Sequence, residues 1–189
     1  MSLLHYLKMP FSFAEDWNKL GAIHPSTWKT FFLLTLPFSF IPPLMLVYMG
    51  SHQTVLSWMT TSSERWQIVA SAFLMTELLT VPLMGWAIKN IAAAHNIPAH
   101  FKDTFRLATV AAIPMWLSSL GLFIPNLWIM AGIVLLGLFF ATRMLYLGSF
   151  SILHINEPVE AQSLSYQVFS LGAILWVLLC AFVVLPLMN

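Results

Sequence analysis

The sequence has 189 residues, of which 59% are hydrophobic and only 8% are charged, and its mean hydropathy is +0.83. Soluble domains carry roughly 25% charged residues, so this composition excludes a water-soluble globular protein and predicts an integral membrane protein. A net charge of +1 argues against a nucleic-acid partner, and a single cysteine, Cys180, excludes an internal disulfide and a cysteine-based metal cluster.

Residues 1–30 do not form a secretory signal, because Glu15 and Asp16 interrupt any apolar run. Ser12 and Glu15 instead make a capping-box pattern, which is followed by an apolar helical face that includes Trp17. We expect a short helix here, in a cytoplasmic N-terminal arm that rests on the membrane surface. A helix that binds a partner protein is the alternative.

Five apolar runs of about twenty residues follow, and these define a domain over residues 31–189. At about 1.5 Å per residue each run covers roughly 27 to 32 Å, which matches the hydrocarbon thickness of a bilayer. Barrel strands would alternate in shorter segments. The predicted fold class is therefore all-α, a polytopic bundle with five transmembrane helices. The predicted spans are Phe31 to Met49, Ile68 to Ile88, Leu107 to Ile124, Leu127 to Leu147 and Val168 to Leu187.

Two short connections are informative. Only Pro125 and Asn126 separate the third and fourth runs, which predicts a tight antiparallel hairpin. The sequence Asn156-Glu157-Pro158 predicts that the fifth helix starts well before its apolar run. Small residues along the third span predict that it lies at the centre of the bundle; they are Ala108, Ala111, Ala112, Ser118 and Ser119.

The basic residues predict the orientation. Seven of the eight fall on one side of the predicted membrane and only Arg65 falls on the other, so the N-terminus is expected in the cytoplasm and the C-terminus outside. Trp28, Trp66 and Trp128 stand at span ends, where an interfacial belt is expected. Packing inside the protein is the alternative for any one of them.

Glu77 lies near the middle of the second span, where an unpaired carboxylate would be unfavourable by several kcal/mol. Its candidate partner is Arg143, which lies in the fourth span at a depth about 7 to 8 Å away. Glu77 could serve as a proton or cation site, or it could be a buried carboxylate satisfied by Arg143, a hydroxyl or a backbone group. Arg143 could instead extend toward cytoplasmic lipid phosphates.

Prolines inside the spans remove backbone donors and free carbonyl groups. Pro42 and Pro43 make the outer half of the first span a candidate broken helix, although kinks that only shape the bundle are commoner.

The histidines show no established metal-ligand spacing, and no phosphate-binding loop, nucleophile elbow or paired catalytic carboxylates occur. We therefore predict no catalytic residue, no metal and no cofactor.

The run Ala111-Ala112-Ile113-Pro114-Met115-Trp116-Leu117, followed by Ile124-Pro125 at a tight turn and by Tyr146-Leu147-Gly148, resembles the Yip family of five-span membrane proteins. The segment His24-Pro25-Ser26 is similar to the bacterial branch of that family. The resemblance implies a bacterial inner-membrane protein. In eukaryotes the family implies adaptors for Rab-type GTPases that use a long cytosolic N-terminal region, and this chain has only about thirty residues there, so fold and topology alone carry over.

The leading functional hypothesis is a non-enzymatic membrane protein that acts by association with other membrane proteins, as a homo-oligomer, or by influencing the lipid bilayer. The alternative is a small permease or channel, for which a water-accessible path to Glu77 is expected. The candidate binding residues are Glu77, Arg143, Pro42, Pro43 and Tyr146.

Overall fold

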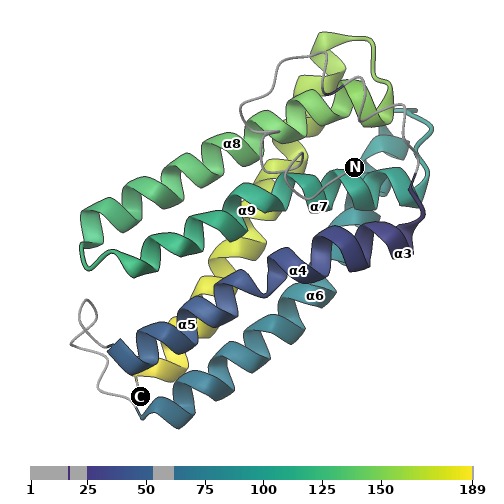
Figure 1. Cartoon of the computed structure of the whole chain (residues 1–189). Helices are drawn as coiled ribbons and strands as arrows, with labels where there is room; N and C mark the ends of the chain where they lie inside the picture. Colours follow the sequence, from purple (N-terminus) through teal and green to yellow (C-terminus); the bar gives the residue numbers. More distant parts are fainter. Residues whose placement is uncertain (1–16, 18–24, 53–61, 189) are drawn as a thin grey trace.

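The computed structural model describes Trp17, residues 25–52 and residues 62–188 (Figure 1). Within these ranges all regular structure is helical, and five helical spans are long and apolar enough to cross a membrane. The predicted fold class and span count are confirmed. The spans cover Thr27–His52, Ser63–Ala94, Phe101–Phe123, Leu127–Leu153 and Pro158–Leu187.

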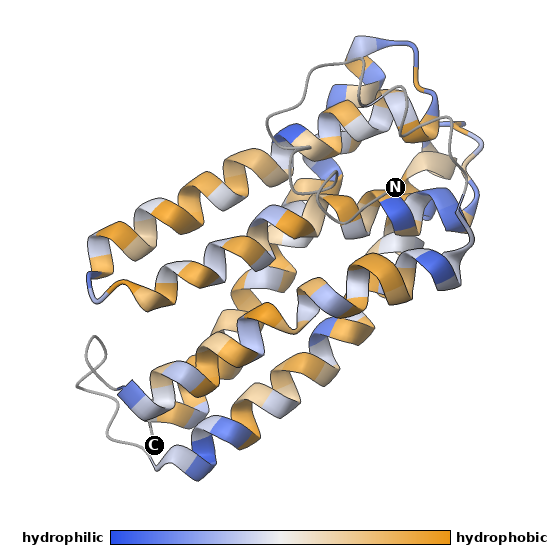
Figure 2. Ribbon diagram, in the orientation of Figure 1, coloured by the Kyte–Doolittle hydropathy of each residue, from blue (hydrophilic) through white to orange (hydrophobic). Residues whose placement is uncertain are grey.

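The helices extend beyond the apolar runs that predicted them. Helix α6 covers Ser63–Ala94, whereas its apolar run covers only Ile68 to Ile88. A helix of 32 residues is about 48 Å long, and the hydrocarbon core is about 30 Å thick. The ends of α6 therefore reach the polar interfacial layers, and Figure 2 shows hydrophilic residues gathered at helix ends and connections.

The first span is an interrupted helix. Pro37 cannot donate to the carbonyl of Leu33, and the chain widens into a π turn just before it. A second break lies at Phe40, one residue before α5. Pro42 and Pro43 themselves sit in the first turn of α5, where a missing N–H is tolerated. The segments are α3 (Thr27–Thr30), the π turn η2 (Phe31–Thr35), α4 (Leu36–Ser39) and α5 (Ile41–His52).

Helix α7 (Phe101–Ser118) lies at the centre of the bundle, as its small residues predict. In the most apolar 18-residue stretch of its span 67% of the residues are buried, against 11% in the same kind of stretch in the last span. A Cβ atom at Gly85 of α6 would lie 2.8 Å from the backbone of Phe105, so only glycine permits this approach of α6 to α7. On another side, the hydroxyl oxygens of Thr109 and Thr35 lie 3.0 Å apart and join α7 to the π turn.

The predicted tight hairpin is confirmed. Helix α7 continues into a short 3-10 turn, η3 (Ser119–Phe123), and α8 (Leu127–Leu153) begins immediately after Asn126. The Asn126 side chain caps α8 by accepting hydrogen bonds from the backbone N–H groups of Trp128 and Ile129 at 3.0 and 3.2 Å.

Helix α9 (Pro158–Met188) starts at Pro158, as predicted. It lies against α8 near their connection, where the hydroxyl oxygens of Ser149 and Ser165 are 3.4 Å apart. Figure 1 shows that the two helices then diverge, and α9 ends close to α5 and the start of α6. There Leu187 packs with Met49, Trp66 and Val69.

Two tryptophans lie in the protein interior rather than at an exposed interfacial position. Trp28 and Trp128 are exposed, as an interfacial belt requires, but Trp66 is only 3% exposed and packs against Gly50 of α5. Trp17, expected on the membrane-facing side of the N-terminal arm, is 1% exposed and belongs to the protein core. Apart from Trp17, residues 1–24 of that arm lie outside the described residues, so the helix expected there stays a prediction, as does the orientation of the bundle.

Candidate binding cavity

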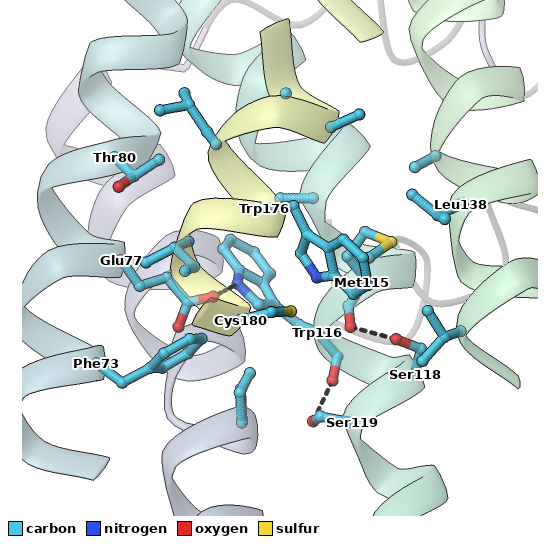
Figure 3. Close-up of a pocket in the computed structure, with 18 of the residues that line it drawn as sticks. Phe73, Glu77, Thr80, Met115, Trp116, Ser118, Ser119, Leu138, Trp176 and Cys180 are labelled. Atoms are coloured by element: carbon cyan, nitrogen blue, oxygen red, sulfur yellow. Dashed lines mark hydrogen bonds between the residues drawn. The ribbon is translucent and has the colours of Figure 1, made fainter. Parts of the chain in front are cut away.

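A cavity of about 390 Å³ lies between α5, α6, α7, α8 and α9. It is more than twice the size of an engineered apolar cavity of about 150 Å³ that binds benzene, and it falls within the range of about 300 to 1,000 Å³ found for ligand sites. The residues that the following paragraphs use are Pro42, Glu77, Trp116, Leu138, Trp176 and Cys180 (Figure 3).

The cavity wall is almost wholly apolar, and its hydroxyl groups are occupied. The side chain of Thr80 donates to the carbonyl of Thr76 at 2.7 Å. Ser118 donates to the carbonyl of Met115 at 2.7 Å, and Ser119 donates to the carbonyl of Trp116 at 2.6 Å (Figure 3). Because these donors are used within their own helices, they offer little to water or to an ion.

Glu77 is the acidic residue of this wall. It lies in the middle of α6 and is 7% exposed. Its Oε1 accepts a hydrogen bond from the indole Nε1 of Trp116 on α7 (Figure 3). Its Oε2 is buried and has no hydrogen-bond partner. The carboxyl group is therefore half-satisfied, in a region where polar atoms usually find partners.

The candidate pair of Glu77 with Arg143 is not formed. The partner of Glu77 is Trp116, and Arg143 is partly exposed on α8. The pair was predicted only from the similar depth of the two residues in the membrane. Two side chains at similar depth meet only when they also point toward each other, and Glu77 points toward α7.

Trp116 is the residue that sequence reasoning missed. Its ring stacks on Phe38 of α4 with centroids 6.3 Å apart and planes 10° apart, and it is 3% exposed. The contact with Phe38 and the hydrogen bond to Glu77 connect α4, α6 and α7. A signal was present in the sequence, because the N–H of a buried tryptophan usually donates to an acceptor.

The five candidate binding residues do not form one site. Glu77 and Pro42 both line the cavity, whereas Pro43 is buried outside the lining. Tyr146 and Arg143, on α8, are also absent from the lining, and the ring of Tyr146 packs edge-on against Phe150 at 5.1 Å.

Metal ligation finds no support in the part of the chain that the structure describes. No group of three or more histidine, cysteine, aspartate or glutamate side chains gathers there. His5 and His24 lie outside the described ranges. Cys180 lines the cavity from α9 and is a free thiol.

A family model described as the Yip1 domain matches residues 5–185, which is nearly the whole chain and confirms the resemblance found in the sequence. No curated protein and no solved structure matches the chain.

Proposed function

The chain belongs to the Yip1 family, and we propose that it acts without catalysis, by holding a hydrocarbon chain of a membrane lipid in the cavity between α5, α6, α7, α8 and α9. The observation that carries this proposal is the cavity itself, with its size of about 390 Å³ and its apolar wall. Holding a lipid in this way is one route by which a membrane protein influences the surrounding bilayer.

A cavity of about 390 Å³ with an apolar wall is filled by molecules from its surroundings. Water is a poor filler, because an apolar wall offers it few hydrogen bonds. In a bilayer the available filler is a lipid chain.

The divergence of α8 and α9 supports lateral entry of such a chain. The lining residues Leu138 of α8 and Trp176 of α9 are only half-buried, so the wall that they form is not sealed by other side chains. These two helices contact each other near their connection and separate beyond it (Figure 1).

A permease built around Glu77 has weaker support. An ion or solute path needs polar groups or water along its length. Although the cavity reaches Glu77, the hydroxyl groups of its wall donate to backbone carbonyls.

The test uses the purified protein in nanodiscs made with phospholipids that carry a photoreactive diazirine in the middle of one acyl chain. We expect crosslinks on cavity residues such as Leu138 and Trp176. Gly172→Leu should reduce these crosslinks several-fold, because a Cβ atom at Gly172 meets only Met84, at 3.6 Å, and the larger side chain would extend into the cavity.

Gly132→Leu is the matched control. Gly132 is exposed on α8, and a Cβ atom there has nothing within 4 Å. Labelling of the cavity should therefore be unchanged. Equal labelling in both variants, crosslinks confined to the outer faces of α8 and α9, or crosslinks to a second protein in native membranes in place of lipid would overturn the proposal.

A further inference from the structure

The cavity is longer than one leaflet of a bilayer is deep. On α9 the half-buried lining residues run from Phe169 to Val184, and on α8 the lining runs from Met130 to Leu145. At about 1.5 Å per residue each of these stretches covers roughly 22 Å. One leaflet contributes about half of a hydrocarbon core that is about 30 Å thick. The cavity therefore extends past the middle of the membrane.

Both ends of the cavity are closed by buried apolar side chains. At the end near the connection between α8 and α9, Ile88 is 0% exposed and Val168 is 1% exposed. At the other end Leu187 packs against Met49 and Trp66. A lipid headgroup cannot pass along the axis of the bundle through such packed residues, so a hydrocarbon chain has to enter from the side.

The side opening lies in the half of the bundle that contains the α7–α8 hairpin. Near their connection α8 and α9 are held together, with the hydroxyl oxygens of Ser149 and Ser165 3.4 Å apart, and the two helices diverge toward the hairpin (Figure 1). In that half the lining residues Val134 of α8 and Cys180 of α9 are only half-buried. A chain that enters here belongs to a lipid of the leaflet on the hairpin side.

The position of the opening sets the length of tail that the cavity needs. A lipid of this leaflet has its headgroup near Leu127, the first residue of α8, and Leu145 lies roughly 27 Å further along that helix. An extended hydrocarbon chain advances about 1.25 Å per bond, so this reach needs about 22 bonds. A tail of about 16 carbons covers only roughly 19 Å, which ends near Leu138 and leaves the far part of the cavity unfilled.

We propose that the ligand is a lipid with a tail of more than about 20 carbons, of the very-long-chain or polyisoprenyl class, which enters between α8 and α9 from the leaflet on the hairpin side. Its tail crosses the middle of the membrane and ends beside Leu145. The inference rests on the proposed function, because it names the class of lipid that fills the same cavity.

The test uses nanodiscs that contain one of two photoreactive phosphatidylcholines, with a tail of about 24 or about 16 carbons and a diazirine beside the terminal carbon. The long tail should label Leu145, which is 6% exposed and so is shielded from the surrounding lipid. The short tail should label Leu138 and Trp176, nearer the hairpin.

Ala108→Leu supplies a plug for the far part of the cavity. Ala108 lines the cavity, and Leu107 beside it meets Gly148 of α8, which places this part of α7 at the level of Leu145. The variant should reduce labelling of Leu145 by the long tail several-fold and leave labelling of Leu138 by the short tail unchanged. The control is Ala131→Leu, the same change at an exposed position of α8, which should alter neither.

The outcomes separate the two proposals. If the long tail labels only the hairpin half, or if the short tail labels Leu145 equally well, the length requirement is refuted and chain binding stands. Unchanged labelling of Leu145 in a folded Ala108→Leu variant would also refute it. If neither tail labels the cavity, both proposals fail. Should Ala108→Leu not fold, the positions labelled by the two tails in the unmodified protein decide the matter.

Discussion

The hydrogen bond between Glu77 and Trp116 should contribute measurably to the stability of the bundle. Trp116→Phe keeps a ring against Phe38 but removes the donor, which leaves both carboxyl oxygens without a partner. Glu77→Leu removes the acceptor and leaves the indole N–H unpaired. The double variant removes both polar groups, so it should be more stable than the sum of the single effects predicts.

The magnitude follows from the environment of the bond. Hydrogen bonds between membrane helices average only about 0.6 kcal/mol in double-mutant cycles, with a maximum near 1.7. Both side chains of this bond are buried, so we expect a value in the upper part of that range. The expected coupling energy is about 1 to 1.7 kcal/mol.

The assay is reversible unfolding by sodium dodecyl sulfate in mixed micelles, followed by far-ultraviolet circular dichroism, which does not depend on the number of tryptophans. The smaller ring of Trp116→Phe leaves a void, but this cost occurs in both the single and the double variant and cancels in the cycle. Single effects that add to within about 0.5 kcal/mol would show that the two side chains are not coupled.

Three further predictions concern packing, capping and access. Gly137→Val should destabilise the bundle by about 1 to 3 kcal/mol, because its Cβ atom would lie 2.9 Å from that of Ser118, whereas Gly132→Val should change the free energy of unfolding by less than about 0.5 kcal/mol. Asn126→Ala should cost about 1 kcal/mol in the same assay through loss of the α8 cap, and an unchanged value would contradict the capping role. Cys180, in the apolar wall, should stay unlabelled in membranes by a charged, water-soluble maleimide, because such a wall excludes both the reagent and the thiolate form; rapid labelling by this reagent would indicate a wet path and favour the permease.

The sequence was sufficient for the features that depend on composition along the chain. Apolar runs locate the spans because lipid requires them. Pro125-Asn126 locates the hairpin because proline removes a helical hydrogen bond and asparagine favours turns and helix caps. Glu77 could also be identified as a candidate site residue, because a carboxyl group in an apolar run is energetically unfavourable whichever way its side chain points.

The features that depend on helix rotation could not be predicted in this way. The rise per residue gives the depth of Arg143 and Glu77 but does not say which neighbour each faces, and Trp116, on a third helix, is the actual partner. Trp66 has the position of an interfacial residue, but the glycine at position 50 allows α5 to approach and cover it. Such contacts depend on how two helices rotate and pack against each other, and the residue pattern along one helix does not specify that packing.

The π turn at Phe31–Thr35 sets the rotational phase of everything that follows it in the first span. One extra residue in a helical turn advances later side chains by about 100° around the axis. Without that residue, Phe38 would swing away from Trp116, and Pro42 and Met49 would turn out of the wall that they now help to build. The irregular turn thus rotates the rest of the first span so that Phe38 faces Trp116 and so that Pro42 and Met49 face the cavity.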